Sequence, residues 1–577
     1  MTKPKSGQAG PNPAFNASGH TRPVNRANWD AVVMRGGILL LVAFLGLAIA
    51  LPILTLLLKS VQAPDGRFVG FANYARYFAT PQLVASLWNS VWVAVVATAV
   101  VLPLAFGYAY AVTRTVMPAK GLFSAIALLP LFAPSLLAAI SFIYIFGNQG
   151  FLKSWLHGGT IYGPWGMILA HVFYCFPHAT IILTTALRLA DGRLYEQASA
   201  LDTSPWRTFT TVTLPGVAYG LVSAGFVIFT MVVTDFGIAK VIGGQFNVLA
   251  TDAYKQVIGQ QNFEMGAVVG FVLLVPAVIA FVVDRRMQRV QGALLSARAV
   301  PLVPVPRRAA DMLALAYCML VGGLLVAVLA VAVWGSFITY WPYNLRLSTK
   351  WYDFAEFEPN GWGPYFASLQ MAGLATLIGT PVVFTGAYLI EKGHGSEKLR
   401  TIAHFLAMLP MAVPGMVLGL GYVFFINARG NPIGLISGTL LLLAINSVAH
   451  FYTTAHVTAT TALKQIDREF EAVGASLHVP FTTTFRRVTM PISLPAILDI
   501  AVYLFVNAMT TVSAVIFLYG PQTKLAAISI VNMDEAGMTA AAAAMATLIV
   551  ATSMVVKLLH LVLERYVLNR FQAWRRR

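Results

Sequence analysis

Long apolar runs constrain this chain more than any other feature. A helix needs about 20 residues to cross roughly 30 Å of hydrocarbon, and the run 36–58 reaches that length with no charged residue before Lys59. Comparable runs follow at about 89–113, 121–147, 165–187, 212–234, 265–283, 312–338, 365–390, 401–428, 433–463, 492–523 and 536–556. They are apolar at consecutive positions, whereas the strands of a membrane barrel alternate apolar with polar residues. We therefore expect an all-α, polytopic membrane protein with about 12 transmembrane helices.

The basic residues indicate how these helices are oriented. A net charge of +17 is compatible with nucleic-acid binding, but no basic stripe with interleaved aromatic residues occurs. Instead, 29 of the 39 Lys and Arg residues lie in alternate connecting segments, namely the N-terminal tail, 113–120, 188–211, 284–311, 391–400, 464–491 and the C-terminal end. Cytoplasmic loops of membrane proteins carry such an excess. The pattern places both termini in the cytoplasm and argues against nucleic acid as a partner.

The chain contains an internal repeat. Segment 184–215 recurs as 460–491, and the proline pair 130/134 recurs as the pair 410/414 at nearly the same offset. Such a constant offset indicates that one six-helix module was duplicated and fused.

The repeat predicts the organisation of the whole chain. We expect a disordered tail at 1–35, a first module at 36–283, a basic linker at 284–311, a second module at 312–565 and a basic cytoplasmic end at 566–577. Because each module has an even number of helices, a pseudo-two-fold axis along the membrane normal would relate them. Prolines inside the spans free backbone carbonyl groups, and their recurrence favours a role in lining a shared pathway.

The repeated segments are polar islands with a common pattern. The first contains Glu196-Gln197-Ala198, then Asp202, then Val212-Thr213-Leu214-Pro215. The second contains Glu471-Ala472-Val473-Gly474, then His478, then Val488-Thr489-Met490-Pro491. This pattern resembles the EAA loop of binding-protein-dependent ABC importer permeases. The resemblance implies that each loop forms a coupling helix lodged in a groove on one of two cytoplasmic ATPase subunits.

The two loops depart from the family pattern in two ways. The loop glycine is replaced by Asp202 in the first copy and by His478 in the second. Asp and His tolerate positive φ better than most residues, so we expect the sharp turn to survive. The acidic residue of the second copy, Glu471, stands one place early, so that Ala472 matches Glu196. We expect the two docking faces to differ.

The chemistry that the chain lacks is also informative. No Gly-x-x-x-x-Gly-Lys-Ser/Thr loop occurs in the sequence, so ATP and Mg²⁺ would be bound by partner subunits and the chain itself would be neither an enzyme nor a cofactor protein. Cys175 and Cys318 are isolated, and we expect no metal site there. The Gly419-x-Gly421 pair lies inside an apolar run, where close helix packing explains it better than nucleotide binding.

Polar residues within the spans are candidates for the substrate pathway. Asp235 and Phe236 stand where the fifth span ends, and further candidates are Asn446, Asn507 and Thr511. Residues such as the last three more often form hydrogen bonds between helices. Asp499 lies near the cytoplasmic side, where Arg486 or Lys464 would be its partner. His171, His178, His450 and His456 are spaced too widely to predict a compact metal site.

The sequence therefore predicts the permease subunit of an ABC importer in the bacterial inner membrane, supplied by a periplasmic binding protein. The resemblance is to the fused two-module permeases for iron(III) or 2-aminoethylphosphonate. Segment 527–550 is more similar to the aminophosphonate branch, which makes phosphonate uptake the first expectation and iron(III) the alternative. An ion-coupled secondary transporter is a more remote alternative, because paired intramembrane charges are scarce. A membrane-embedded enzyme is disfavoured, because no nucleophile and base converge.

Overall fold

The computed structural model describes residues 26–294, 300–393, 396–428, 430–467, 469–477 and 479–571. Within these residues the protein is helical except for one antiparallel hairpin, β1 (Ile338–Tyr340) and β2 (Asn344–Leu347). Nine helices in the described part are long and apolar enough to cross a membrane, and twelve spans result if three bent helix pairs each count as one. The expectation of an all-α polytopic protein is confirmed.

The first half holds four unbroken spans after the first helix, which is interrupted by a π turn. The bounds are α1 (Arg26–Leu45), α2 (Leu51–Ser60), α4 (Pro81–Arg114), α7 (Pro164–Leu189), α10 (Leu214–Thr234) and α13 (Phe263–Leu294). The second half holds α14 (Arg308–Ser336), α15 (Gly363–Glu391), α18 (Leu440–Lys464) and α24 (Thr539–Phe571). Both ends of the predicted linker 284–311 are therefore helical, and residues 295–299 lie outside the described part.

The repeated prolines break the third span of each half. In the first half, α5 (Lys120–Leu128) and α6 (Ser135–Phe146) meet at 99°, and in the second half α16 (Glu397–Met408) and α17 (Gly415–Ile426) meet at 114°. A short 3-10 turn beginning at Leu129 or Leu409 joins each pair. Pro134 and Pro414 have extended backbone and precede the second helix. Proline has no N–H to donate and clashes with the preceding turn, so each run bends here instead of crossing straight.

The eleventh predicted span, 492–523, is also bent. The helix α22 (Leu494–Thr510) covers only its first part and meets the preceding segment, Phe481–Ile492, at 75°. Residues 511–525 then run without a helix to α23 (Ala526–Glu535). A continuous apolar run was therefore not sufficient to predict one continuous helix.

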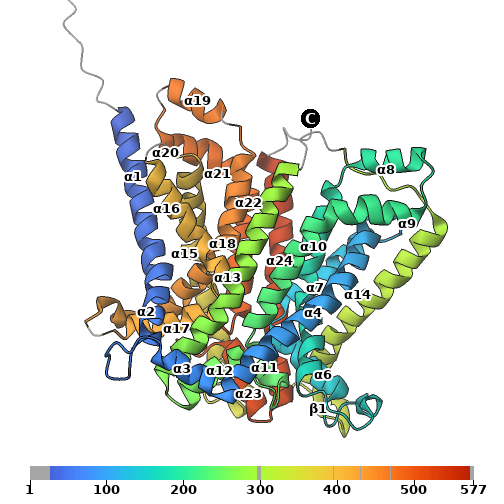
Figure 1. Cartoon of the computed structure of the whole chain (residues 1–577), viewed down its shortest axis with the longest axis vertical. Coiled ribbons are helices and arrows are strands. Elements are labelled where there is room, and N and C mark those ends of the chain that lie inside the picture. The colour runs from blue at the N-terminus through green and yellow to red at the C-terminus, as the bar shows by residue number, and fades with distance from the viewer. Residues whose placement is uncertain are drawn as a thin grey trace, which may run out of the picture.

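The first helix of each half packs against the other half. Helix α1 contacts α15 and α16, α2 contacts α17, and α14 contacts α4, α5 and α6. Figure 1 shows this exchange, with α1 beside α15 and α16 at one side and α14 beside α4 at the other. Apolar surfaces from both halves thus form one continuous core instead of two separate ones.

The two halves also share a pair of equivalent hydrogen bonds at one end of the molecule, where a short helix begins in each half. Ser90 on α4 accepts from the backbone N–H of Leu249, which begins α12 (Leu249–Tyr254), at 2.8 Å. Ser368 on α15 accepts from the N–H of Ala526, which begins α23, at 2.8 Å. Both serines cap the N-terminus of the helix that precedes the last span of their half.

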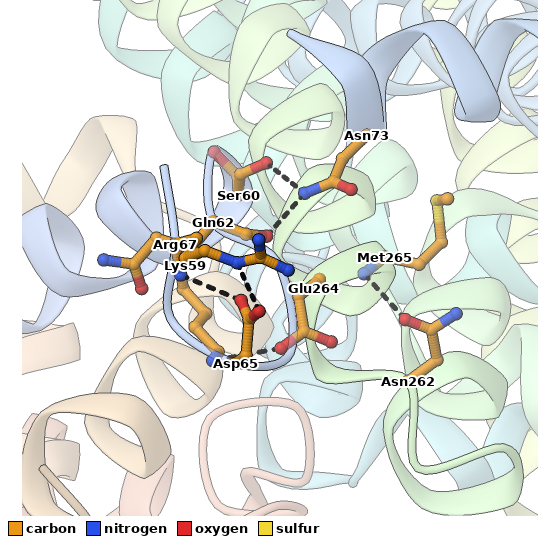
Figure 2. A network of polar contacts seen from close by, with 9 residues as sticks. All are labelled: Lys59, Ser60, Gln62, Asp65, Arg67, Asn73, Asn262, Glu264 and Met265. Carbon is orange, nitrogen blue, oxygen red and sulfur yellow. Dashed lines mark hydrogen bonds and ion pairs between the residues drawn. The ribbon is translucent and has the colours of Figure 1, made fainter. Parts of the chain in front are cut away.

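At the same end of the molecule, polar contacts hold the first span against the last span of the first half, as Figure 2 shows. Lys59 at the end of α2 forms an ion pair of 3.0 Å with Glu264 at the start of α13. Asn73 donates to the backbone carbonyl groups of Ser60 and Gln62 at 3.0 and 2.8 Å. The first span is therefore held by its own half at this end, although it also packs on the other half.

Candidate functional site

Both predicted coupling loops lie at the end of the molecule opposite to α12 and α23 (Figure 1). The first forms α8 (Gly192–Ala200) and α9 (Pro205–Thr208), and the second forms α19 (Glu469–Ser476) and α20 (Phe481–Thr484). Asp191 caps α8 by accepting from the N–H of Arg193 at 3.1 Å. The two loops thus share one local design of a short helix, a turn and a second short helix.

The turn after α8 has the geometry that the sequence predicted. Asp202 has a φ of 49°, in the left-handed region, and the N–H of Thr203 donates to the carbonyl of Ala198 at 3.0 Å. A left-handed residue enclosed by such a hydrogen bond is the usual glycine-type helix stop. In the second loop the N–H of Val479 donates to the carbonyl of Gly474 at 2.9 Å, which is the equivalent bond. His478 lies outside the described residues.

A leucine in each loop points into solvent. Leu201 is 78% exposed, and Leu477, which occupies the equivalent position of the second loop, is 70% exposed. Other exposed apolar residues flank them, namely Leu194, Trp206, Phe470 and Val473. Beside Leu477 lies a groove of about 620 Å³ between α19 and the segment that follows it. The two leucines were not predicted as site residues, although their equivalent places in the repeat were a signal that could have identified them.

Most of the motif residues in the first loop are accessible. Glu196, Gln197 and Asp202 are exposed, whereas Ala198 is buried. Leu214 and Pro215 begin α10 and are also exposed.

The second loop is arranged differently. Ala472 and Met490 are exposed, Pro491 is half-buried, and Gly474 faces Thr484, whose Oγ1 would lie 3.0 Å from an added Cβ. Glu471 faces inward, where both carboxylate oxygens lie 3.1 Å from the ammonium of Lys392. The carboxylate of Glu471 is therefore engaged within the chain, whereas Glu196 is exposed.

A cavity of about 290 Å³ lies between the two halves. Its walls contain equivalent positions from both, each pair at the offset of the repeated loops: Tyr174 and His450, His178 and Thr454, Val227 and Tyr503, and Met231 and Asn507. These pairs come from α7 and α18 and from α10 and α22. These paired contributions show that the cavity lies between equivalent helices of the two halves.

Two of the five predicted pathway residues, Asp235 and Asn507, line this cavity. Phe236 and Thr511 are buried and do not line it. Asn446 is fully buried, and its amide donates to the carbonyl of Ala514 at 2.7 Å.

Asp235 does not simply reach water at a helix end. Its side chain is 10% exposed, and Oδ2 accepts from the N–H of Ile238 at 2.8 Å. The same oxygen lies 3.7 Å from Nε2 of His171. The carboxylate therefore faces the cavity while it is held by neighbours on both sides.

The histidines of the described part are dispersed over several segments. Within the described residues, no three His, Cys, Asp or Glu side chains are placed to hold a metal ion. His178 and His450 line the cavity from opposite halves, and His171 lies beside Asp235. Asp499 lies 3.2 Å from Nε2 of His560 on α24, so the expectation that Arg486 or Lys464 would be its partner was wrong.

Comparison with known proteins agrees with the architecture. Residues 102–290 and 385–569 match the model of the family described as binding-protein-dependent transport system inner membrane component. The ferric transport system permease protein FbpB of Actinobacillus pleuropneumoniae is 25% identical over 490 residues, covering 82% of this chain and 69% of the relative. A putative ferric transport system permease protein FbpB 1 of Haemophilus influenzae is 26% identical over 461 residues, covering 76% and 70%.

A third relative matches less of the chain. The sulfate transport system permease protein CysW of Escherichia coli is 24% identical over 226 residues, which is 39% of this chain and 74% of the relative. The family model, in contrast, matches both halves in turn and includes both coupling loops. The chain therefore belongs to the binding-protein-dependent transport system inner membrane component family, as a multi-pass ABC importer permease without an ATPase domain or a cofactor of its own.

Proposed function

We propose that this chain imports iron(III) across the bacterial inner membrane. A periplasmic binding protein delivers the ion to the end that holds α12 and α23, and two ATPase subunits dock on α8 and α19 in the cytoplasm. The observation that carries the docking of two ATPase subunits is the pair of exposed leucines, Leu201 and Leu477, at equivalent positions of the two loops, and the cargo is inferred from the names of the relatives.

The docking of two ATPase subunits follows from the exposed surface of the loops. A large apolar side chain at a water-exposed helix end gains free energy only when a partner covers it, and full burial of a leucine contributes about 1.5–3 kcal/mol. The motif residues Glu196, Gln197, Asp202, Leu214 and Pro215 flank this face in the first loop, and Ala472, Gly474, His478, Met490 and Pro491 belong to the second. The same face occurs twice, which supports two docked subunits.

The names of the relatives favour iron(III) as the cargo. The two relatives FbpB and FbpB 1, each of which covers more than two thirds of this chain, are named ferric transport permeases. The first expectation, 2-aminoethylphosphonate, finds no support in these names. The iron(III) alternative therefore replaces phosphonate uptake as the proposed activity.

The chemistry of the cavity is compatible with passage of a metal ion. Asp235, Tyr174 and Tyr503 offer carboxylate and phenol oxygens, and His178 and His450 offer imidazole nitrogens. These groups are suitable iron ligands, but in the described part they do not gather into a closed set. A conducting path needs groups that attract the cargo without retaining it, so Asp235 and Asn507 remain our candidates for contacting it.

The docking test changes one leucine in each loop. Leu201→Asp and Leu477→Asp should each weaken capture of the cognate ATPase by about 10-fold or more, because each removes an apolar contact worth roughly 1.5–3 kcal/mol. Leu435→Asp is the matched control, since Leu435 is 90% exposed at the opposite end. The measurement is the affinity between purified permease in nanodiscs and the ATPase. Unchanged capture by both loop variants would contradict docking at these loops.

The cargo test uses the cognate binding protein and reconstituted vesicles. Iron(III) should raise the melting temperature of the binding protein, because a ligand that binds the native state stabilises it by mass action. Vesicles that contain the permease and the ATPase should accumulate labelled iron only with ATP. A shift with 2-aminoethylphosphonate and none with iron(III) would return the assignment to phosphonate uptake.

A further inference from the structure

The two halves place a cation at the same position, where the second span of each half ends. Arg114 ends α4, and Lys392, its equivalent in the repeat, follows the last residue of α15. Each cation donates to a backbone carbonyl group close to the point where the fourth span of its half ends. Arg114 Nη2 donates to Leu187 at 2.6 Å, and Lys392 Nζ donates to Ile466 at 3.2 Å.

Each cation also contacts a residue of the coupling helix, and the two residues are equivalent in the repeat. The contact is a cation–π interaction in the first half and an ion pair in the second. The guanidinium of Arg114 lies over the ring of Tyr195 on α8, 4.8 Å from the centroid. The ammonium of Lys392 is paired with both oxygens of Glu471 on α19 at 3.1 Å. Tyr195 and Glu471 are separated by the same offset as the two loops. The displaced acidic residue of the second loop thus occupies the position that faces the cation.

The rest of this contact is the same in both halves. In the first half, the ring of Phe209 lies 6.0 Å from Phe106 and 6.2 Å from Tyr110. In the second half, the ring of Phe485 lies 5.9 Å from Phe384 and 4.6 Å from Tyr388. The aromatic packing between loop and span is therefore preserved in both halves. The halves differ in the partner of the cation, which is an aromatic ring in the first half and a carboxylate in the second.

We propose that Arg114–Tyr195 and Lys392–Glu471 are the anchors that transmit movement of the coupling helices to α4 and α15. This inference rests on the proposed function, because it assumes that ATPase subunits move α8 and α19. The second anchor is well protected, with Lys392 and Glu471 only 7% and 18% exposed, so water screens it less than a surface ion pair.

The anchors are connected to the cavity through helix packing. Helix α15 packs against α18 and α22, which supply His450, Thr454, Tyr503 and Asn507 to the cavity wall. Helix α4 packs against α7 and α10, which supply the equivalent residues of the first half. The four residues of the anchors act here as positioning residues, since they do not line the cavity.

The test measures labelled cargo transported per ATP hydrolysed in vesicles that contain the full complex. Lys392→Met and Glu471→Gln should each lower this ratio at least about 5-fold, the range of a typical coupling between sites, while capture of the ATPase stays unchanged. The double variant Lys392→Glu/Glu471→Lys should restore part of the ratio, because it rebuilds the ion pair with reversed charges but loses the hydrogen bond to the carbonyl of Ile466. Lys398→Met is the matched control, since Lys398 is an exposed cation on the neighbouring helix α16.

A second variant exchanges the chemistry of the two halves. Lys392→Arg/Glu471→Tyr places the first-half pair in the second half and should keep the ratio close to that of the unaltered chain, whereas Glu471→Leu should not. An unchanged ratio in both Lys392→Met and Glu471→Gln would overturn the anchors and leave the proposed function intact. If Lys392→Met does not fold, the ratio measured for Glu471→Gln is sufficient to test the anchors, provided that this variant has a normal melting temperature. Failure of the unaltered chain to capture any ATPase would instead overturn the proposed function.

Discussion

Gly421 on α17 permits a close contact between the two halves of the protein. A Cβ added at this position would lie 2.5 Å from the carbonyl oxygen and 2.8 Å from the carbonyl carbon of Pro52 on α2. The obstacle is helix backbone, so no side chain can turn aside to make room. Earlier on the same helix, a Cβ at Gly419 would lie 2.4 Å from the carbonyl oxygen of Ala514. The Gly419-x-Gly421 pair thus packs against neighbouring backbone, as the sequence predicted.

The cost of Gly421→Ala follows from these distances. Nonbonded carbon contacts favour about 3.5–4.0 Å, so α17 and α2 would have to separate by roughly 1 Å. Such overpacking costs about 1–3 kcal/mol, and alanine recovers up to about 1 kcal/mol through its better helix propensity. We expect a net loss of free energy of unfolding of roughly 1–2 kcal/mol, together with a looser contact between the halves.

The assay is thermal unfolding of the purified protein in nanodiscs, with Gly373→Ala as the matched control. Gly373 lies within α15, and a Cβ added there meets no atom within 4 Å. The control should therefore melt at or slightly above the temperature of the unaltered protein, and Gly421→Ala should melt below it. The packing argument would be refuted if Gly421→Ala melted as high as Gly373→Ala.

Two further predictions concern the two ends of the molecule. Glu196→Ala should weaken ATPase capture without lowering the melting temperature, because Glu196 is exposed to solvent; equal losses of both would contradict a docking role. At the opposite end, burial raises the pKa of Asp534 on α23 to about 6. A raised native pKa means that stability is greatest below about pH 4, falls between about pH 4 and 6, and is level above that range. A shift of about two pKa units corresponds to about 3 kcal/mol, so Asp534→Asn should remove up to about 3 kcal/mol of this pH dependence. Melting curves from pH 4 to 7 measure it, and an unaltered pH dependence in the variant would contradict the assignment to Asp534.

The sequence was sufficient to predict where the apolar segments lie, because hydropathy acts locally, but nine of them in the described part are unbroken spans and the predicted twelve are reached only if each bent pair counts as one. The bends at Pro134 and Pro414 were only partly predictable: the recurrence marked both positions, but the angles of 99° and 114° depend on packing. The exchange of α1 and α14 between the halves was not predicted. In lipid, apolar surface alone does not select a partner helix, since packing detail drives association.

In the candidate site too, features set by local sequence were predicted, whereas contacts between distant parts of the chain were not. The positive φ of Asp202 was predicted, because it depends on the preference of one residue type. The partners of Glu471 and Asp499 were not predicted, because Lys392 and His560 come from distant parts of the chain. Leu201 and Leu477 were overlooked although their equivalent places in the repeat marked them, because the sequence does not show that both side chains are exposed.

The exchanged helices also bring each predicted coupling loop into contact with both halves. The N–H of Phe481, which begins α20 of the second half, donates to Asp30 on α1 of the first half at 3.2 Å. The N–H of Gly192, which begins α8, donates at 2.8 Å to the carbonyl of Val300 in the segment that leads into α14. Each loop therefore contacts its own half through Arg114 or Lys392, and it contacts the other half through α1 or through the segment before α14. If ATPase subunits dock at these loops as proposed, a force applied to either loop would reach both halves through these contacts.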